Sequence, residues 1–102
     1  MEKQRCVKMD TIMKNMLMVA LRDLFQEEKA KGIPVEESRN LVLKLADYEG
    51  TKLFLADNEY KKVIEALNKL RNAYLAAGRY PDGIDVVFYK ILKAKYKRCP
   101  AQ

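Results

Sequence analysis

Apolar side chains recur along this chain at spacings of three and four residues, in stretches that glycine and proline separate. In the first stretch Met13, Leu17, Ala20 and Leu24 follow this spacing. The 3.6-residue period of an α-helix brings such positions onto one face as an apolar stripe. The pattern therefore predicts several amphipathic helices, each of which must bury one side against a neighbour.

Four helices are predicted. Asp10 is a typical N-cap and Gly32 a typical residue after a helix C-terminus, while Pro34 suits a first helical turn. The expected spans are about residues 10–31, 34–48, 57–77 and 84–97. The apolar segment Thr51–Ala56 could form a short strand, but we interpret it as a connection because no second strand is evident to pair with it.

Four amphipathic helices with short connections fold most simply as an antiparallel up-down bundle. We therefore predict an all-α fold, with residues 1–102 forming a single four-helix bundle domain. No internal repeat is evident in the amino-acid sequence. A chain of this length can bury enough apolar surface to fold without a metal or a disulfide.

The composition argues against an enzyme. The chain has 20 basic and 14 acidic residues, a net charge of +6 and no histidine, so the commonest general base and metal ligand is missing. Two cysteines cannot supply a four-ligand zinc site, and the single serine, Ser38, has no histidine to activate it. We predict no catalytic residue, no metal site and no cofactor, and hence a binding protein.

The sequence also predicts the cellular compartment of the protein and whether its two cysteines are paired. The apolar run Met16–Leu21 is too short for a signal peptide or a membrane span, so a cytoplasmic location is expected. Cys6 and Cys99 are then expected to be unpaired thiols. A bridge between them is the alternative, because an up-down bundle would bring both to the same end.

Positive charge is concentrated near the end of the chain, where residues 84–102 hold five basic side chains and one acidic one. On the predicted fourth helix, Lys90, Lys93 and Lys97 share one stripe. The predicted partner-binding residues there are Tyr89, Lys90, Lys93, Tyr96, Lys97 and Arg98. Such a surface suits lipid headgroups, an acidic protein or nucleic-acid phosphates, and the alternative is a solvated lysine face.

Arg79 and Tyr80 are a second candidate contact, in the turn before the fourth helix. Arginine and tyrosine are residue types favoured at interface hot spots. The alternative interpretation is ordinary turn chemistry, with Pro81 fixing the backbone and Gly83 freeing it.

The predicted layout resembles that of the class IIa bacteriocin immunity proteins of the enterocin A immunity type. The resemblance rests on the long first helix, on Leu41–Tyr48, on Lys52–Leu55 with Asp57–Leu70, and on Gly78-Arg79, and it spans about residues 9–97. It implies an antiparallel four-helix bundle that protects a cell from a pore-forming peptide. Such proteins act at the inner membrane face on the bacteriocin together with its receptor, a mannose phosphotransferase permease.

In that family, specificity is attributed to the C-terminal part, which corresponds here to residues 84–102. The alternative hypothesis is a small basic nucleic-acid-binding or regulatory protein. The net charge favours it, whereas Asp57 and Glu59 at the start of the third helix oppose its use as a recognition helix. Nucleic acid is accordingly not the expected partner.

Overall fold

The structure is a computed structural model that describes residues 3–48 and 50–98. Four helices and three short strands alternate along this part of the chain. In order they are β1 (Lys3–Lys8), α1 (Thr11–Lys31), α2 (Glu36–Ala46), β2 (Lys52–Leu55), α3 (Asp57–Ala76), α4 (Asp82–Leu92) and β3 (Lys95–Arg98).

The first helix begins and ends where the amino-acid sequence predicts. A carboxylate oxygen of Asp10 accepts a hydrogen bond from the backbone N–H of Met13 at 2.8 Å, which caps the helix start. Gly32 ends the helix with φ 73°, a left-handed conformation that disfavours residues with a Cβ. Met13, Leu17, Ala20 and Leu24, the stripe identified above, are all buried. Periodicity and capping thus locate this helix to within a residue or two.

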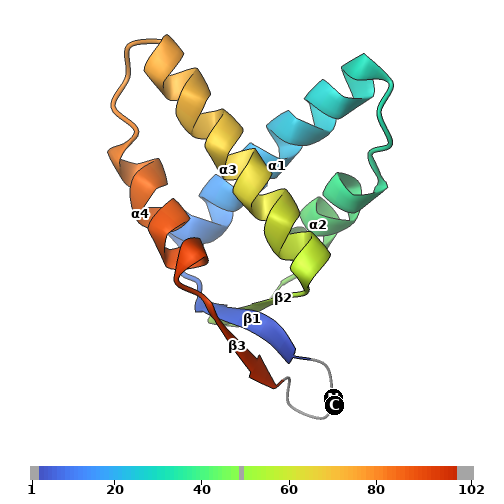
Figure 1. Ribbon diagram of the computed structural model, residues 1–102, viewed down its shortest axis with the longest axis vertical. Helices are drawn as coiled ribbons and strands as arrows, with labels where there is room; N and C mark the ends of the chain where they lie inside the picture. The colour runs from blue at the N-terminus through green and yellow to red at the C-terminus, as the bar shows by residue number, and fades with distance from the viewer. Residues whose placement is uncertain (1–2, 49, 99–102) are drawn as a thin grey trace.

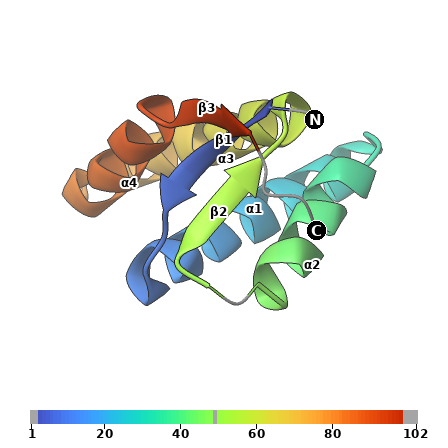
Figure 2. The ribbon, with the colours of Figure 1, turned by 90° about the horizontal axis from the view of Figure 1, so that it is seen from below.

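The three strands form one antiparallel sheet in the order β2-β1-β3. In the pairing of β1 with β2, Val7 lies opposite Leu53; in the pairing of β1 with β3, Arg5 lies opposite Tyr96. Figure 2 views the sheet from the side that no helix covers, with the helices behind it. Within residues 3–48 and 50–98, the sheet therefore has one face packed on the helices and one face that no helix covers, called the open face below.

Two expectations about local structure are wrong. Thr51–Ala56 is not a bare connection, because Lys52–Leu55 pairs with Lys3–Lys8, the strand that the sequence interpretation lacked. The fourth helix does not reach Lys97: it ends at Leu92, and Lys95–Arg98 is strand β3. Beyond Leu92 the apolar stripe stops, and the backbone of this segment bonds to β1 instead.

The molecule is mostly helical, as predicted, but the up-down bundle is not confirmed. The helices form two hairpins, α1 with α2 and α3 with α4, and α1 packs across α3 where the hairpins meet (Figure 1). No helix in the described part of the chain is long and apolar enough to cross a membrane.

The two halves of the chain repeat the same arrangement of one strand and two helices. Helix α1 begins at Thr11 and α3 at Asp57, and α2 begins at Glu36 and α4 at Asp82, so each second-half helix starts 46 positions after its counterpart. The buried positions follow the same offset. They pair as Val7 with Leu53, Leu17 with Val63, Ala20 with Ala66, Leu21 with Leu67, Leu24 with Leu70, Leu41 with Val87 and Leu45 with Ile91.

The register of the sheet shows how these halves are related. Val7 pairs with Leu53, its own counterpart, whereas Cys6 pairs with Phe54 and Lys8 with Lys52. A strand pair in which one residue faces its equivalent has a local twofold axis through that residue pair. The fold is therefore an approximately twofold arrangement of two βαα units, with β3 added at the free edge of β1. This repeat is one that the amino-acid sequence does not reveal.

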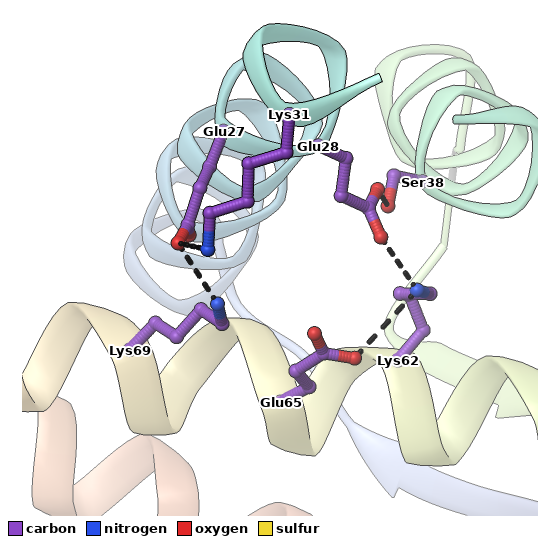
Figure 3. A network of polar contacts seen from close by, with 7 residues as sticks. All are labelled: Glu27, Glu28, Lys31, Ser38, Lys62, Glu65 and Lys69. Carbon is purple, nitrogen blue, oxygen red and sulfur yellow. Dashed lines mark hydrogen bonds and ion pairs between the residues drawn. The ribbon is translucent and has the colours of Figure 1, made fainter. Parts of the chain in front are cut away.

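A network of polar side chains ties α1, α2 and α3 together away from the sheet (Figure 3). The buried Glu28 carboxylate accepts a hydrogen bond from the Ser38 hydroxyl at 2.6 Å and another from the Lys62 ammonium at 2.8 Å. At the more exposed side, Glu27 accepts hydrogen bonds from Lys31 and Lys69, both at 3.0 Å. The buried carboxylate is thus satisfied by one partner from each neighbouring helix.

This network shifts the acid–base equilibria of its members. Burial raises the pKa of Glu28, but the hydrogen bonds from Lys62 and Ser38 outweigh it, and the pKa lies below its ordinary value. Burial lowers the pKa of Lys62, but its hydrogen bond to Glu28 together with the nearby charges of Glu65, Glu28 and Glu37 outweighs that effect, so the pKa of Lys62 is raised. Both shifts favour the charged pair in the folded state.

We expect Glu28→Gln to lower the free energy of unfolding by about 1.5–3 kcal/mol, because a hydrogen bond between charged, buried groups is replaced by a weaker one. Urea denaturation at neutral pH measures the change. The matched control is Glu65→Gln, which removes the exposed carboxylate 3.6 Å from the same Lys62 and should change stability by less than about 0.5 kcal/mol.

The same variant has a pH signature. Because the folded-state pKa of Glu28 is lowered, its stabilisation is present above the ordinary carboxyl pKa and is lost as the pH falls through the lowered value. The difference between wild type and Glu28→Gln should therefore shrink in acid. A difference that stays constant down to the acid-unfolded state would contradict this assignment.

Candidate functional site

The open face of the sheet is the most distinctive surface of the molecule. Val7, Leu53 and Leu55 are buried against the helices. Since successive strand side chains point to opposite faces, the alternate positions line the open face. In β1 and β2 these are Gln4, Cys6, Lys8, Lys52 and Phe54, with Lys8 and Lys52 exposed and none of the five acidic.

Lys8 and Lys52 are directly opposite each other in the strand pairing. Like charges at opposed positions of a sheet destabilise it. Neither lysine makes an ion pair with any residue that the structure describes. The fold therefore leaves this pair of like charges uncompensated among the residues that the structure describes.

Lys90 extends this cationic region onto α4. It is exposed and lines an open hollow together with Lys8, Met9, Asp10 and Thr51, at the end of β1. The acid in this hollow, Asp10, is engaged at the N-terminus of α1. We call Lys8, Lys52 and Lys90 the cationic sheet face.

The position equivalent to Lys90 in the first half has a structural role. Lys44 donates hydrogen bonds to the Phe54 carbonyl at 2.7 Å and to Glu59 at 3.0 Å. The Tyr48 hydroxyl, which donates to the Lys52 carbonyl, covers the same outer edge of β2. Burial raises the pKa of Tyr48, opposed by its hydrogen bond with the Phe54 backbone. These side chains block the edge of β2 against addition of a further strand.

The second half lacks these arrangements. Met13 stands at the position equivalent to Glu59, Ala94 stands at that of Tyr48, and the edge of β1 is occupied by β3. Lys90 is therefore released from the edge-covering role of Lys44 and faces solvent. The comparison separates a lysine held by the fold from one available to a partner.

The predicted partner-binding residues fall into three groups. On α4, Tyr89 and Lys90 are exposed, and the ammonium of the exposed Lys93 lies 4.8 Å from the centre of the Tyr89 ring. A cation at this distance over an aromatic face is attracted to it, so Tyr89 and Lys93 form one surface unit.

Tyr96, Lys97 and Arg98 do not continue that stripe. They lie on β3, where they are the register partners of Arg5, Gln4 and Lys3. The predicted helical face of Lys90, Lys93 and Lys97 is therefore wrong, because the helix ends before Lys97. The three residues instead belong to the backbone ladder of the sheet.

Arg79 and Tyr80 lie in the loop between α3 and α4, at the end of α4 remote from β3 (Figure 1). The guanidinium of Arg79 lies 4.5 Å from the centre of the Tyr74 ring, and Tyr80 is 87% exposed. This pair is consequently separate from the cationic sheet face.

The predicted thiols and possible metal ligands lie as follows. Cys6 is half-buried at an open-face position of β1, opposite Lys95, and Cys99 lies outside the described residues. Within residues 3–48 and 50–98, no three cysteine or acidic side chains are grouped so as to hold a metal ion.

Lys8, Lys52 and their strand pairing were missed at the sequence level. The amino-acid sequence gives little signal for them, because Gln4 and Arg5 are both polar and break the period-two alternation typical of a half-buried strand. Comparison of the chain with protein-family models, curated proteins and solved structures finds no match.

The equivalence of Lys44 and Lys90 yields a paired prediction. Lys44→Ala should lower the free energy of unfolding by about 1–2 kcal/mol, because Glu59 and the Phe54 carbonyl both lose a partner. Lys90→Ala should change it by less than about 0.5 kcal/mol. Equal losses in urea denaturation of the two variants would show that Lys90 is also held by the fold.

Proposed function

We propose that the protein binds duplex nucleic acid through the cationic sheet face. The observation that carries the proposal is the open sheet on which Lys8 and Lys52 stand opposite each other without acidic partners. Lysines of this kind exchange condensed counterions of a polyanion for direct phosphate contacts, which is the main source of non-specific affinity.

The dimensions of the sheet support a duplex. Strands lie about 4.8 Å apart, and the major groove of B-DNA, about 12 Å wide, admits a two-stranded ribbon such as the β1–β2 pair. Proteins that recognise DNA with strands lay them in a groove, where side chains of one face meet base edges. Lysine and glutamine, present here at Lys8, Lys52 and Gln4, donate hydrogen bonds to purine acceptors in that groove.

The symmetry of the fold supports the same partner. A duplex has local twofold axes perpendicular to its length, and DNA-binding proteins with twofold symmetry align with them. Here the approximate twofold axis passes between Val7 and Leu53, at the centre of the β1–β2 pair. The strand β3 continues the same sheet at the other edge of β1.

We expect the protein to bind a fluorescein-labelled DNA duplex of about 20 base pairs, with an affinity that falls steeply between about 50 and 200 mM NaCl. Lys8→Ala with Lys52→Ala should weaken binding and reduce the slope of log affinity against log salt by nearly 2, since each phosphate contact contributes about 0.9. Fluorescence anisotropy measures both quantities.

The matched control is Arg22→Ala with Lys29→Ala, which removes two exposed cations from α1 and should leave the salt slope nearly unchanged. Three results would overturn the proposal: no binding by the wild type, tighter binding of the separated single strand than of the duplex, or equal effects of the two double variants.

A second candidate function is the bacteriocin immunity role that the family resemblance implies, exercised at the inner face of a membrane. The observation that favours it is an apolar stripe on α4, where Val86, Tyr89 and Leu92 are 58%, 60% and 51% exposed beside Lys90 and Lys93. Exposed apolar residues flanked by lysine are typical of helices that lie on anionic lipid.

This candidate predicts that expression of the chain raises the resistance of a sensitive strain to a class IIa peptide, and that Tyr89→Ala with Leu92→Ala removes the protection. Vesicles of phosphatidylglycerol and phosphatidylcholine should retain the wild type more strongly than this variant. Unchanged killing across a panel of class IIa peptides, with no vesicle binding, would eliminate the candidate.

A further inference from the structure

A groove between α1 and α2 combines an apolar floor with a basic rim. It encloses about 310 Å³. Phe25, Val42 and Leu43 supply apolar surface, and Arg22, Lys29 and Arg39 supply three positive charges. Phe25 and Val42 are half-buried, whereas Leu43 is 55% exposed on a helix that is otherwise polar on its outer side.

The basic rim has no acidic counterpart in the groove. No aspartate or glutamate lines it. In the described part of the chain, Arg22, Lys29 and Arg39 make no ion pair. Three cations gathered around exposed apolar side chains therefore have no compensating charge from the fold itself.

The repeat provides an internal reference for this groove. The equivalent hollow between α3 and α4 is lined by Asn68, Arg71, Asp85, Phe88, Tyr89 and Leu92, five of which occupy positions equivalent to Arg22, Phe25, Arg39, Val42 and Leu43.

There the Arg71 guanidinium bonds to the Asp85 carboxylate at 2.7 Å, an ion pair that joins the two helices. In the first half, Phe25 replaces the arginine and Arg39 replaces the aspartate. The second groove thus contains its own carboxylate, and the first has an additional cation at that position.

We propose that the α1–α2 groove binds an acidic amphipathic helix of a partner protein, whose carboxylates pair with Arg22, Lys29 and Arg39 while its apolar side chains contact Phe25, Val42 and Leu43. This mode of recognition places apolar anchors spaced at i, i+3, i+4 and i+7 into a hydrophobic groove. The charges around the groove then select acidic partners and accelerate their association.

Charge complementarity favours this occupant over others. A second copy of the chain carries a net charge of +6, so two copies repel each other. A phosphate backbone has no apolar side to cover Val42 and Leu43. Helices α1 and α2 lie on the covered side of the sheet (Figure 2), so a partner bound there leaves the cationic sheet face open.

The test uses a labelled helical peptide made of glutamate and leucine, with leucine at i, i+3, i+4 and i+7, and a second peptide in which lysine replaces every glutamate. The wild-type protein should bind the glutamate peptide, and the lysine peptide at least about tenfold more weakly. Phe25→Arg with Arg39→Asp rebuilds the ion pair of the second groove and should weaken binding of the glutamate peptide at least about tenfold.

If circular dichroism shows that the first variant does not fold, Arg22→Ala with Lys29→Ala provides a second groove variant. It should also weaken binding of the glutamate peptide. Lys8→Ala with Lys52→Ala is the control and should bind the peptide like the wild type. The proposal is overturned if the wild type does not bind the glutamate peptide, if both peptides bind equally, or if the control loses as much affinity as the groove variants.

Discussion

The pairing of β1 with β2 is the interaction on which the arrangement of the molecule depends. It places Val7 opposite Leu53, two buried side chains from equivalent positions of the two halves. Because the strands precede α1 and α3, this contact also determines how those helices approach each other. Helices α1 and α3 pack together across the same approximate axis, and the shorter helices α2 and α4 complete the two hairpins (Figure 1). The apolar core thus extends continuously from the sheet into all four helices.

The helices could be predicted from the amino-acid sequence, whereas the sheet could not. Each helix carries its own signals within a few turns: the stripe from Met13 to Leu24, the cap at Asp10, the stop at Gly32. A strand of four residues such as Lys52–Leu55 becomes stable only through a partner, and its partner Lys3–Lys8 lies more than 40 positions earlier. The β1–β3 pairing joins segments even further apart, from Lys3 to Arg98. Local periodicity contains no information about such pairings.

The candidate site also combines features that local sequence signals predict with features that depend on strand pairing. The concentration of basic residues near the end of the chain predicts a binding surface there; Tyr89 and Lys90 of α4, and Lys93 just after it, are exposed. The helix predicted for Lys97 ends five residues earlier, so Lys97 is part of strand β3. Lys8 and Lys52 gain significance only from being opposite each other. The amino-acid sequence does not reveal the repeat because equivalent positions share burial but not residue type. Leu17 is equivalent to Val63, and Ser38 to Ile84; all four are buried.

Because the two similar units lie in one chain, equivalent positions can carry different side chains, which is impossible in a dimer of identical subunits. In a dimer of identical subunits, both halves of a sheet face would present the same side chains, and a dyadic ligand could bind in either direction with equal affinity. Here Cys6 is equivalent to Lys52, and Lys8 to Phe54. The surface accordingly has a head and a tail, and any ligand lying along it meets a thiol and an ammonium on one side and an aromatic ring with a second ammonium on the other. The side chains that differ between the halves would make the two orientations of a bound ligand unequal in energy.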